Sequence, residues 1–174
     1  MLANQIGYYS LILGLMISVL LCGVAIKDLN SSAKQIKQNV FSLSFLQLFF
    51  VIVSFLSLIL SFINSDFSNE TVFNNSHTTK PLFYKISGTW GNHEGSLLLW
   101  LLVLTLFIFL FLIKSRKQPK KYRILTLLFQ QMIIIGFFLF VLMTSNPFNY
   151  LFPTPTEGLG LNPILQDPAL AIHP

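Results

Sequence analysis

The chain has 174 residues, of which 53% are hydrophobic and only 10% are charged, with a mean hydropathy of +0.69. These values exclude an ordinary soluble domain and indicate a membrane protein. The formal net charge of +5 does not indicate nucleic-acid binding, because the basic residues lie in short loops between apolar runs. The single cysteine, Cys22, excludes an internal disulfide, and the missing CxxCH motif excludes a c-type cytochrome.

Four apolar runs predict an all-α membrane protein with four transmembrane helices. A helix rises about 1.5 Å per residue and must cross roughly 30 Å of hydrocarbon, so the third and shortest run must take in residues from one end. None of the runs contains Asp, Glu, Lys, Arg or His, which argues against a transporter or proton-translocating subunit. The runs form a membrane domain over residues 1–143, with helices at about 5–26, 40–63, 97–113 and 124–143.

Glutamines are the most polar residues of the runs. Gln47 lies in the second run, where it can hydrogen-bond to a neighbouring helix. Gln130 and Gln131 are adjacent in the fourth run and point about 100° apart on a helix. Both cannot face lipid at low cost, so at least one should have a partner on another helix.

Charge distribution predicts the orientation of the chain in the membrane. Most of the 11 basic residues lie in two loops, 27–39 and 114–123. The positive-inside rule places these loops inside and both termini on the outer side, together with the long loop 64–96. The first half of that long loop is rich in Asn, Ser and Thr, and we expect it to be flexible.

The tail, residues 144–174, is rich in proline. It carries Pro147, Pro153, Pro155, Pro163, Pro168 and Pro174, which are most of the 8 prolines of the chain. Proline removes a backbone donor and fixes φ, so regular helix is excluded over most of this segment. We expect an extended tail of turns that lies on the outer face.

The stretch from Tyr84 to Trp100, YKISGTWGNHEGSLLLW, concentrates glycine, tryptophan, histidine and glutamate before the third run. If it is helical from Gly88 onward, Gly88, Gly91 and Gly95 share one narrow face, where another backbone can approach closely. The short third run draws Glu94 and Gly95 to the membrane surface. Three glycines weaken a helix by about 1 kcal/mol each, so a turn within the stretch remains an alternative.

The opposite face of the same helix would carry Trp90, His93 and Trp100. Two indoles and an imidazole offer a stacking surface and a metal ligand. The alternative is that the tryptophans are interfacial anchors of the membrane segment and that His93 is a solvated side chain.

Two segments carry a resemblance to a known family. They are GTWGNHEGSLLLW at 88–100, and the tail with SNPF at 145–148 and LNPILQDPALAIHP at 161–174. In this order, separated by two membrane runs, they resemble CcmF, the haem lyase subunit of cytochrome c maturation. The resemblance implies that haem from a haem chaperone is attached through thioethers to the CxxCH cysteines of apocytochrome c on the outer face.

The resemblance also implies site residues. His173, followed by Pro174, resembles the first outer-face histidine of the family, an axial ligand of the haem iron. Trp90, His93 and Trp100 become candidates for the haem pocket, with haem b as the substrate or as a group shared with a partner chain.

The family's tryptophan-rich loop and its remaining haem-ligating histidines have no counterpart in this sequence. The expectation is therefore the N-terminal portion of a split or truncated member, inactive alone, with the rest of the haem lyase on another chain. The alternative is a structural assembly subunit that does not contact haem.

The 18 phenylalanines, with many Ile, Asn and Lys residues, are typical of an AT-rich genome. This composition favours a multi-pass protein of the mitochondrial inner membrane, with a bacterial plasma membrane as the alternative.

Overall fold

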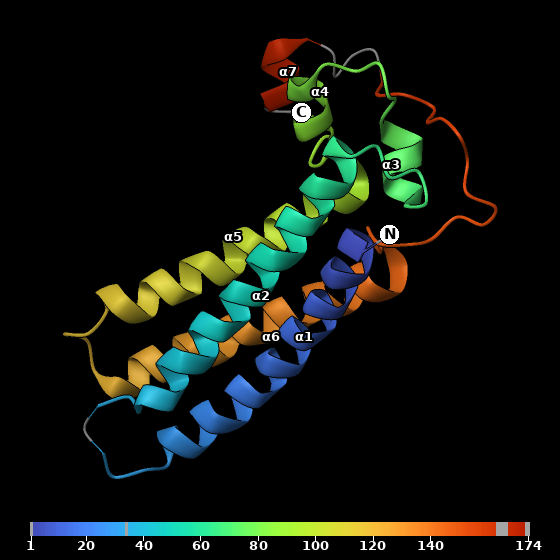
Figure 1. Cartoon of the computed structure of the whole chain (residues 1–174). Coiled ribbons are helices and arrows are strands. Elements are labelled where there is room, and N and C mark those ends of the chain that lie inside the picture. The colour runs from blue at the N-terminus through green and yellow to red at the C-terminus, as the bar shows by residue number, and fades with distance from the viewer. Residues whose placement is uncertain (1, 34, 163–166, 173–174) are drawn as a thin grey trace.

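Four long helices form a bundle in the computed structural model, which describes residues 2–33, 35–162 and 167–172 (Figure 1). They are α1 (Leu2–Leu29), α2 (Gln38–Ile63), α5 (His93–Lys114) and α6 (Lys120–Thr144). Each is long and apolar enough to span a membrane, and the described residues contain no β-strand. The prediction of an all-α protein with four membrane-spanning helices is confirmed.

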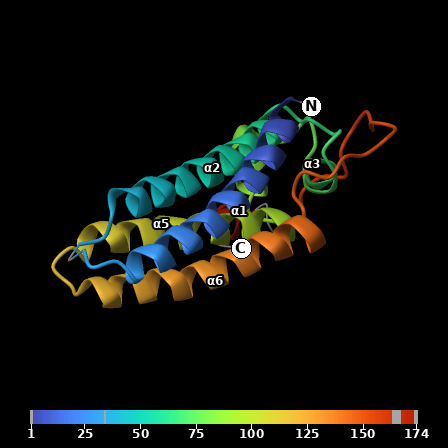
Figure 2. The same ribbon diagram turned by 90° about the horizontal axis from the view of Figure 1, so that it is seen from below.

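The bundle has two different ends. Helix α1 packs on α2 and α6, and α5 packs on the same two helices (Figures 1 and 2). One end carries the short helices α3 (Glu70–Asn75), α4 (Leu82–Gly88) and α7 (Pro168–Ile172), together with residues 145–162. We call this the loop-rich end, and the end with the connections 30–37 and 115–119 the basic end. Helix α1 starts at the loop-rich end, so the described chain begins and finishes on the same side.

The helices extend beyond the apolar runs that predicted them. Helix α5 begins at His93 instead of residue 97, and α6 begins at Lys120, directly after Pro119. Long basic side chains such as Lys120 place their stems along the helix and their charges in the headgroup region. Polar residues at the run ends therefore continue the helices.

A buried polar cluster links three helices in the middle of the bundle. Ser18 of α1, Gln47 of α2 and Gln131 of α6 are buried. The Gln47 and Gln131 amides donate to each other's oxygen at 3.0 Å. Ser18 donates to Gln131 Oε1 at 3.1 Å and accepts from Gln47 Nε2. The prediction that one of the adjacent glutamines has a helix partner is confirmed for Gln131.

The first half of the long loop is folded, so the expectation of flexibility is wrong. Phe67 and Val72 belong to the hydrophobic core, and α3 starts with Asn69 as its cap, whose side chain accepts from Val72 N–H. The polar composition of this segment suggested a flexible loop. In the structure, the side chain of Asn69 forms hydrogen bonds with other parts of the chain. The tail also contains a short helix, α7, which begins at Pro168, a position where proline's fixed φ favours the first helical turn.

The polar cluster yields the first prediction. Replacing Gln131 with leucine removes its hydrogen bonds to Ser18 and Gln47 and leaves the Gln47 amide oxygen without this donor, so we expect a loss of about 1–2 kcal/mol in the free energy of unfolding. The matched control is Gln130→Leu, which changes the same chemistry one position away on a half-buried side chain. Unfolding in mixed detergent micelles, followed by circular dichroism, measures both. Equal losses in the two variants would contradict a specific role of the cluster.

Candidate functional site

Asn92 organises the junction between α4 and α5. Its Oδ1 accepts from Gly95 N–H at 2.8 Å and so caps α5. Its Nδ2 donates to the carbonyl oxygens of Gly88 at 2.6 Å and Thr89 at 3.2 Å, at the end of α4. One side chain therefore satisfies backbone groups of both helix ends, which fixes the turn 89–92 between them.

Residues 88–100 do not form one helix, so the expectation of a continuous glycine face is wrong. Helix α4 ends at Gly88, and Gly91 lies in the turn, where its N–H donates to Ser87 O at 3.0 Å. The alternative of a turn within the stretch is what the structure has. The turn is favoured over a continuous helix because the Asn92 side-chain amide forms hydrogen bonds with three backbone groups.

Close backbone approach occurs at Gly95. A Cβ at this position would collide with the Thr89 carbonyl oxygen and lie 2.8 Å from the Thr89 carbonyl carbon. Gly88 is less constrained, because its Cβ would lie 3.2 Å from a ring carbon of Phe62. The carbonyl of the turn thus folds over the first turn of α5, and only glycine leaves room for it.

Trp90 joins the turn to the end of the tail. Its half-buried ring packs against the hydrophobic core, and its Nε1–H donates to the Ala171 carbonyl of α7 at 3.2 Å. Because Trp90 precedes α5, its direction is set by the turn and not by the face of that helix. Helices α4 and α7 pack together at the loop-rich end (Figure 1).

His93 and Trp100 share an exposed face of α5. His93 opens the helix, and its Nε2 forms a 3.0 Å hydrogen bond with Ser145 Oγ. Trp100 is 60% exposed, two helical turns further along the apolar helix. Glu94 lies in the first turn of α5, where a negative charge is favourable next to the free N–H groups. The structure therefore separates Trp90 from the stripe that the sequence predicted.

A second asparagine attaches the tail to the folded loop. Asn69 Nδ2 donates to Pro147 O at 2.8 Å and to Asn4 Oδ1 at 2.6 Å. Asn4 in turn donates to Phe148 O at 3.1 Å, and the Phe148 ring contacts the backbone of α1 at Gly7. The SNPF segment is thus buried among α1, the long loop and, through Ser145, α5.

Further along the tail, Glu157 docks on the connection between α3 and α4. Its carboxylate accepts from Thr78 N–H at 3.0 Å and from Thr78 Oγ1 at 2.5 Å. These hydrogen bonds, with a smaller contribution from Gly158 N–H and nearby His77, lower the pKa of Glu157 to about 2. The tail is therefore attached at several points between residues 145 and 160.

Sequence reasoning did not single out Asn69 and Asn92. Asn92 had a usable signal, since Asn directly before an apolar helix is a preferred cap. Asn69 had none, because its partners Asn4 and Pro147 are far away in sequence. His173 and Pro174 lie outside the described residues, and the described part of the chain holds no group of three His, Cys, Asp or Glu side chains suited to a metal ion.

Comparisons with known proteins match either the C-terminal half of the chain or nearly all of it. The family model described as cytochrome C assembly protein matches residues 90–174. The CycK cytochrome c-type biogenesis protein of Rhizobium meliloti is 42% identical over 98% of this chain and 25% of its own length. The CcmF protein of Haemophilus influenzae is 36% identical over 98% of this chain and 26% of its own length. The CcmF protein of Escherichia coli is 44% identical over 70% of this chain and 19% of its own length.

A solved structure, of the cytochrome c haem lyase CcmF, superimposes with a TM-score of 0.74 and 28% identity. The match covers 84% of this chain and 25% of that chain. The chain thus spans about a quarter of the length of the relatives that match nearly all of it.

These similarities define a class, the membrane proteins of cytochrome c assembly, and the matched region contains the turn, α5, α6 and the tail. Within this class, the chain belongs to the CcmF family.

The contact at Gly95 gives the second prediction. Gly95→Ala places a methyl group against the Thr89 carbonyl, and we expect it to destabilise the protein by about 1–3 kcal/mol through overpacking. Gly136→Ala is the matched control, because a Cβ there meets nothing within 4 Å and alanine favours helix. Thermal unfolding in detergent compares them. A Gly95→Ala protein as stable as the control would contradict the close-approach interpretation.

Glu157 gives the third prediction, on pH. Its pKa is lowered from 4.5 to about 2 in the folded protein, so its contribution to tail docking is present above pH 4.5 and is lost as the pH falls towards 2. Hydrogen exchange at the Thr78 amide, corrected for intrinsic rates, should show protection that decreases over this interval. In Glu157→Gln the protection should be weaker and nearly independent of pH. A wild-type profile that is flat below pH 4.5 would contradict the assignment.

Proposed function

We propose that this chain forms the N-terminal part of a haem lyase and helps to present haem for attachment to the CxxCH cysteines of apocytochrome c. The observation that carries the proposal is the hydrogen bond from Trp90 Nε1 to the Ala171 carbonyl. It fastens the tail two residues before His173 against the turn 89–92. A ligand near a chain end holds iron poorly when its backbone is mobile, since ordering costs roughly 1–2 kcal/mol per residue.

His173 is the proposed axial ligand, because an imidazole nitrogen is a good ligand for haem iron. Trp90 and His93 are proposed to border the haem, Trp90 through its ring and His93 through its exposed imidazole beside Ser145. Trp100 is assigned to the edge of this pocket, where its exposed ring also suits the membrane interface. Haem b is the proposed substrate, delivered by a haem chaperone.

The site requires more than this chain. Around the turn 89–92, the described residues supply the imidazole of His93 and the hydrogen-bonded indole of Trp90, which is less than a haem needs for enclosure. In the proposed function, the remaining segments of the family's protein complete the site, and the chain alone is inactive. The expectation that a second chain carries them is tested by identifying the proteins that co-purify with the native complex.

The proposed location is the mitochondrial inner membrane, with the loop-rich end on the outer, intermembrane-space side. Support comes from the basic residues, which concentrate at the opposite end, and from the phenylalanine-rich composition. In a bacterial plasma membrane, the same orientation would place the site in the periplasm, where c-type cytochromes would receive haem.

The fourth prediction tests the ligand. In the native complex, His173→Ala should lower the yield of holocytochrome c and the haem absorbance of the purified complex at least about tenfold, because a direct iron ligand is lost. His93→Ala is the matched histidine control and should retain most of both signals. Haem staining of the cytochrome and absorbance spectra measure them, while co-purification shows that the complex is intact. Normal yield in His173→Ala would contradict the ligand role and favour a structural subunit.

A further inference from the structure

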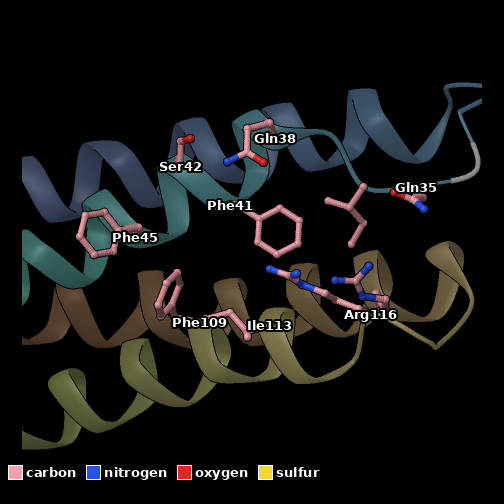
Figure 3. Close-up of a pocket in the computed structure, with 10 residues that line it drawn as sticks. Gln35, Gln38, Phe41, Ser42, Phe45, Phe109, Ile113 and Arg116 are labelled. Carbon is pink, nitrogen blue, oxygen red and sulfur yellow. The ribbon is translucent and has the colours of Figure 1, made fainter.

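The basic end holds a pocket that the proposed haem function does not use. It lies between α2, α5, the start of α6 and the connection 30–37, and has a volume of about 680 Å³ (Figure 3). Its lining combines two guanidinium groups with apolar side chains from facing helices. The principal residues are Arg116, Arg123, Phe41, Phe45, Phe109 and Ile113.

Both arginines lie close to the same aromatic ring. The guanidinium carbons of Arg116 and Arg123 are 5.9 and 5.7 Å from the centre of the Phe41 ring (Figure 3). Arg123 is only 4% exposed, and it donates from Nη2 to Leu112 O at 2.6 Å and from Nε to Ser115 Oγ at 3.0 Å. Its position is therefore fixed by the end of α5, and Arg116 lies beside it.

No carboxylate neutralises this pair among the described residues. The one acidic residue of the basic end, Asp28, is engaged by Lys120 Nζ at 3.2 Å, Ser31 Oγ at 3.0 Å and Lys37 N–H at 2.9 Å. Two neighbouring cations without a counter-charge repel each other, and one of them is buried. An anion bound between them would remove this repulsion and accept bidentate hydrogen bonds from free guanidinium N–H groups.

The pocket changes from charged to apolar along the bundle. Arg116 and Arg123 lie at the helix ends, at the depth of the headgroups. Phe45 is seven residues inside α2 and Phe109 five residues before the end of α5, so the apolar wall reaches roughly 8–10 Å further into the hydrocarbon. Phe45 is 55% exposed, and its ring lies 5.7 Å from that of Phe109. A free phosphate would use only the charged part of such a pocket.

We propose that this pocket binds an anionic phospholipid from the leaflet at the basic end, with its phosphate between Arg116 and Arg123 and an acyl chain along Phe45 and Phe109. Basic pockets between transmembrane helices on the inner side suit such headgroups. A zwitterionic lipid brings its own cation next to the arginines and binds less well. The site is independent of the haem proposal, since it lies at the opposite end of the bundle (Figure 1).

Native mass spectrometry of the 174-residue chain in detergent tests the proposal, with phosphatidylglycerol and phosphatidylcholine of identical acyl chains as probes. We expect one phosphatidylglycerol per chain, bound at least about fivefold more tightly than phosphatidylcholine, since each basic group near a lipid phosphate contributes such a factor. Arg116→Gln should abolish this preference. Arg116 is the suitable position because its side chain is exposed and forms no hydrogen bond or ion pair in the described structure.

Lys117→Gln is the matched control, because it removes the same charge from the next residue, which does not line the pocket. It should change phosphatidylglycerol affinity less than about twofold. Equal affinity for both lipids, or equal losses in Arg116→Gln and Lys117→Gln, would overturn the proposal in favour of diffuse attraction. Displacement of phosphatidylglycerol by an equal concentration of inorganic phosphate would also overturn it and indicate a free-anion site.

Discussion

The hydrocarbon interior of a bilayer provides no water to hydrogen-bond with backbone or amide groups, and the structure depends on this constraint. Within the bundle every long segment is helical, and the strongly polar amides Gln47 and Gln131 pair with each other and with Ser18 across three helices. Irregular backbone is confined to the two ends. At these ends, side-chain amides form hydrogen bonds with backbone groups that water would bind in a soluble protein.

Asn92 and Asn69 show how the loop-rich end becomes a defined surface. Each uses both its amide oxygen and its amide nitrogen, Asn92 to join two helix ends and Asn69 to cap α3 while holding the tail. The turn and the tail are therefore positioned by the same fold that spans the membrane. For a protein that is proposed to hold haem between a turn and a tail, this coupling matters, because a preorganised site avoids the entropic cost of ordering the tail at each binding event.

The two ends differ in how their charges are compensated. At the basic end, Lys120 is paired with Asp28 and with carbonyl groups of the connection after α1, which ties α6 to α1. Arg116 and Arg123 have no acidic partner among the described residues. The membrane itself is the nearest abundant source of negative charge, and the proposed lipid site at this end is separated from the proposed haem site at the other end of the bundle.

The four membrane-spanning helices can be predicted without the structure, because the length of an apolar run is a local property of the sequence and decides whether a helix spans the bilayer. The sequence also indicates that at least one of Gln130 and Gln131 needs a partner, and that two ordered motifs resemble the CcmF family; the structure shows that the paired glutamine is Gln131. The three-dimensional fold was needed to establish that residues 89–92 form a turn, that Trp90 faces α7 and that residues 64–76 are folded. These outcomes depend on pairs such as Asn69 with Pro147 and Trp90 with Ala171, which lie 78 and 81 residues apart. No local periodicity encodes such a pair, since its energy exists only once the helices have brought both partners to the same end.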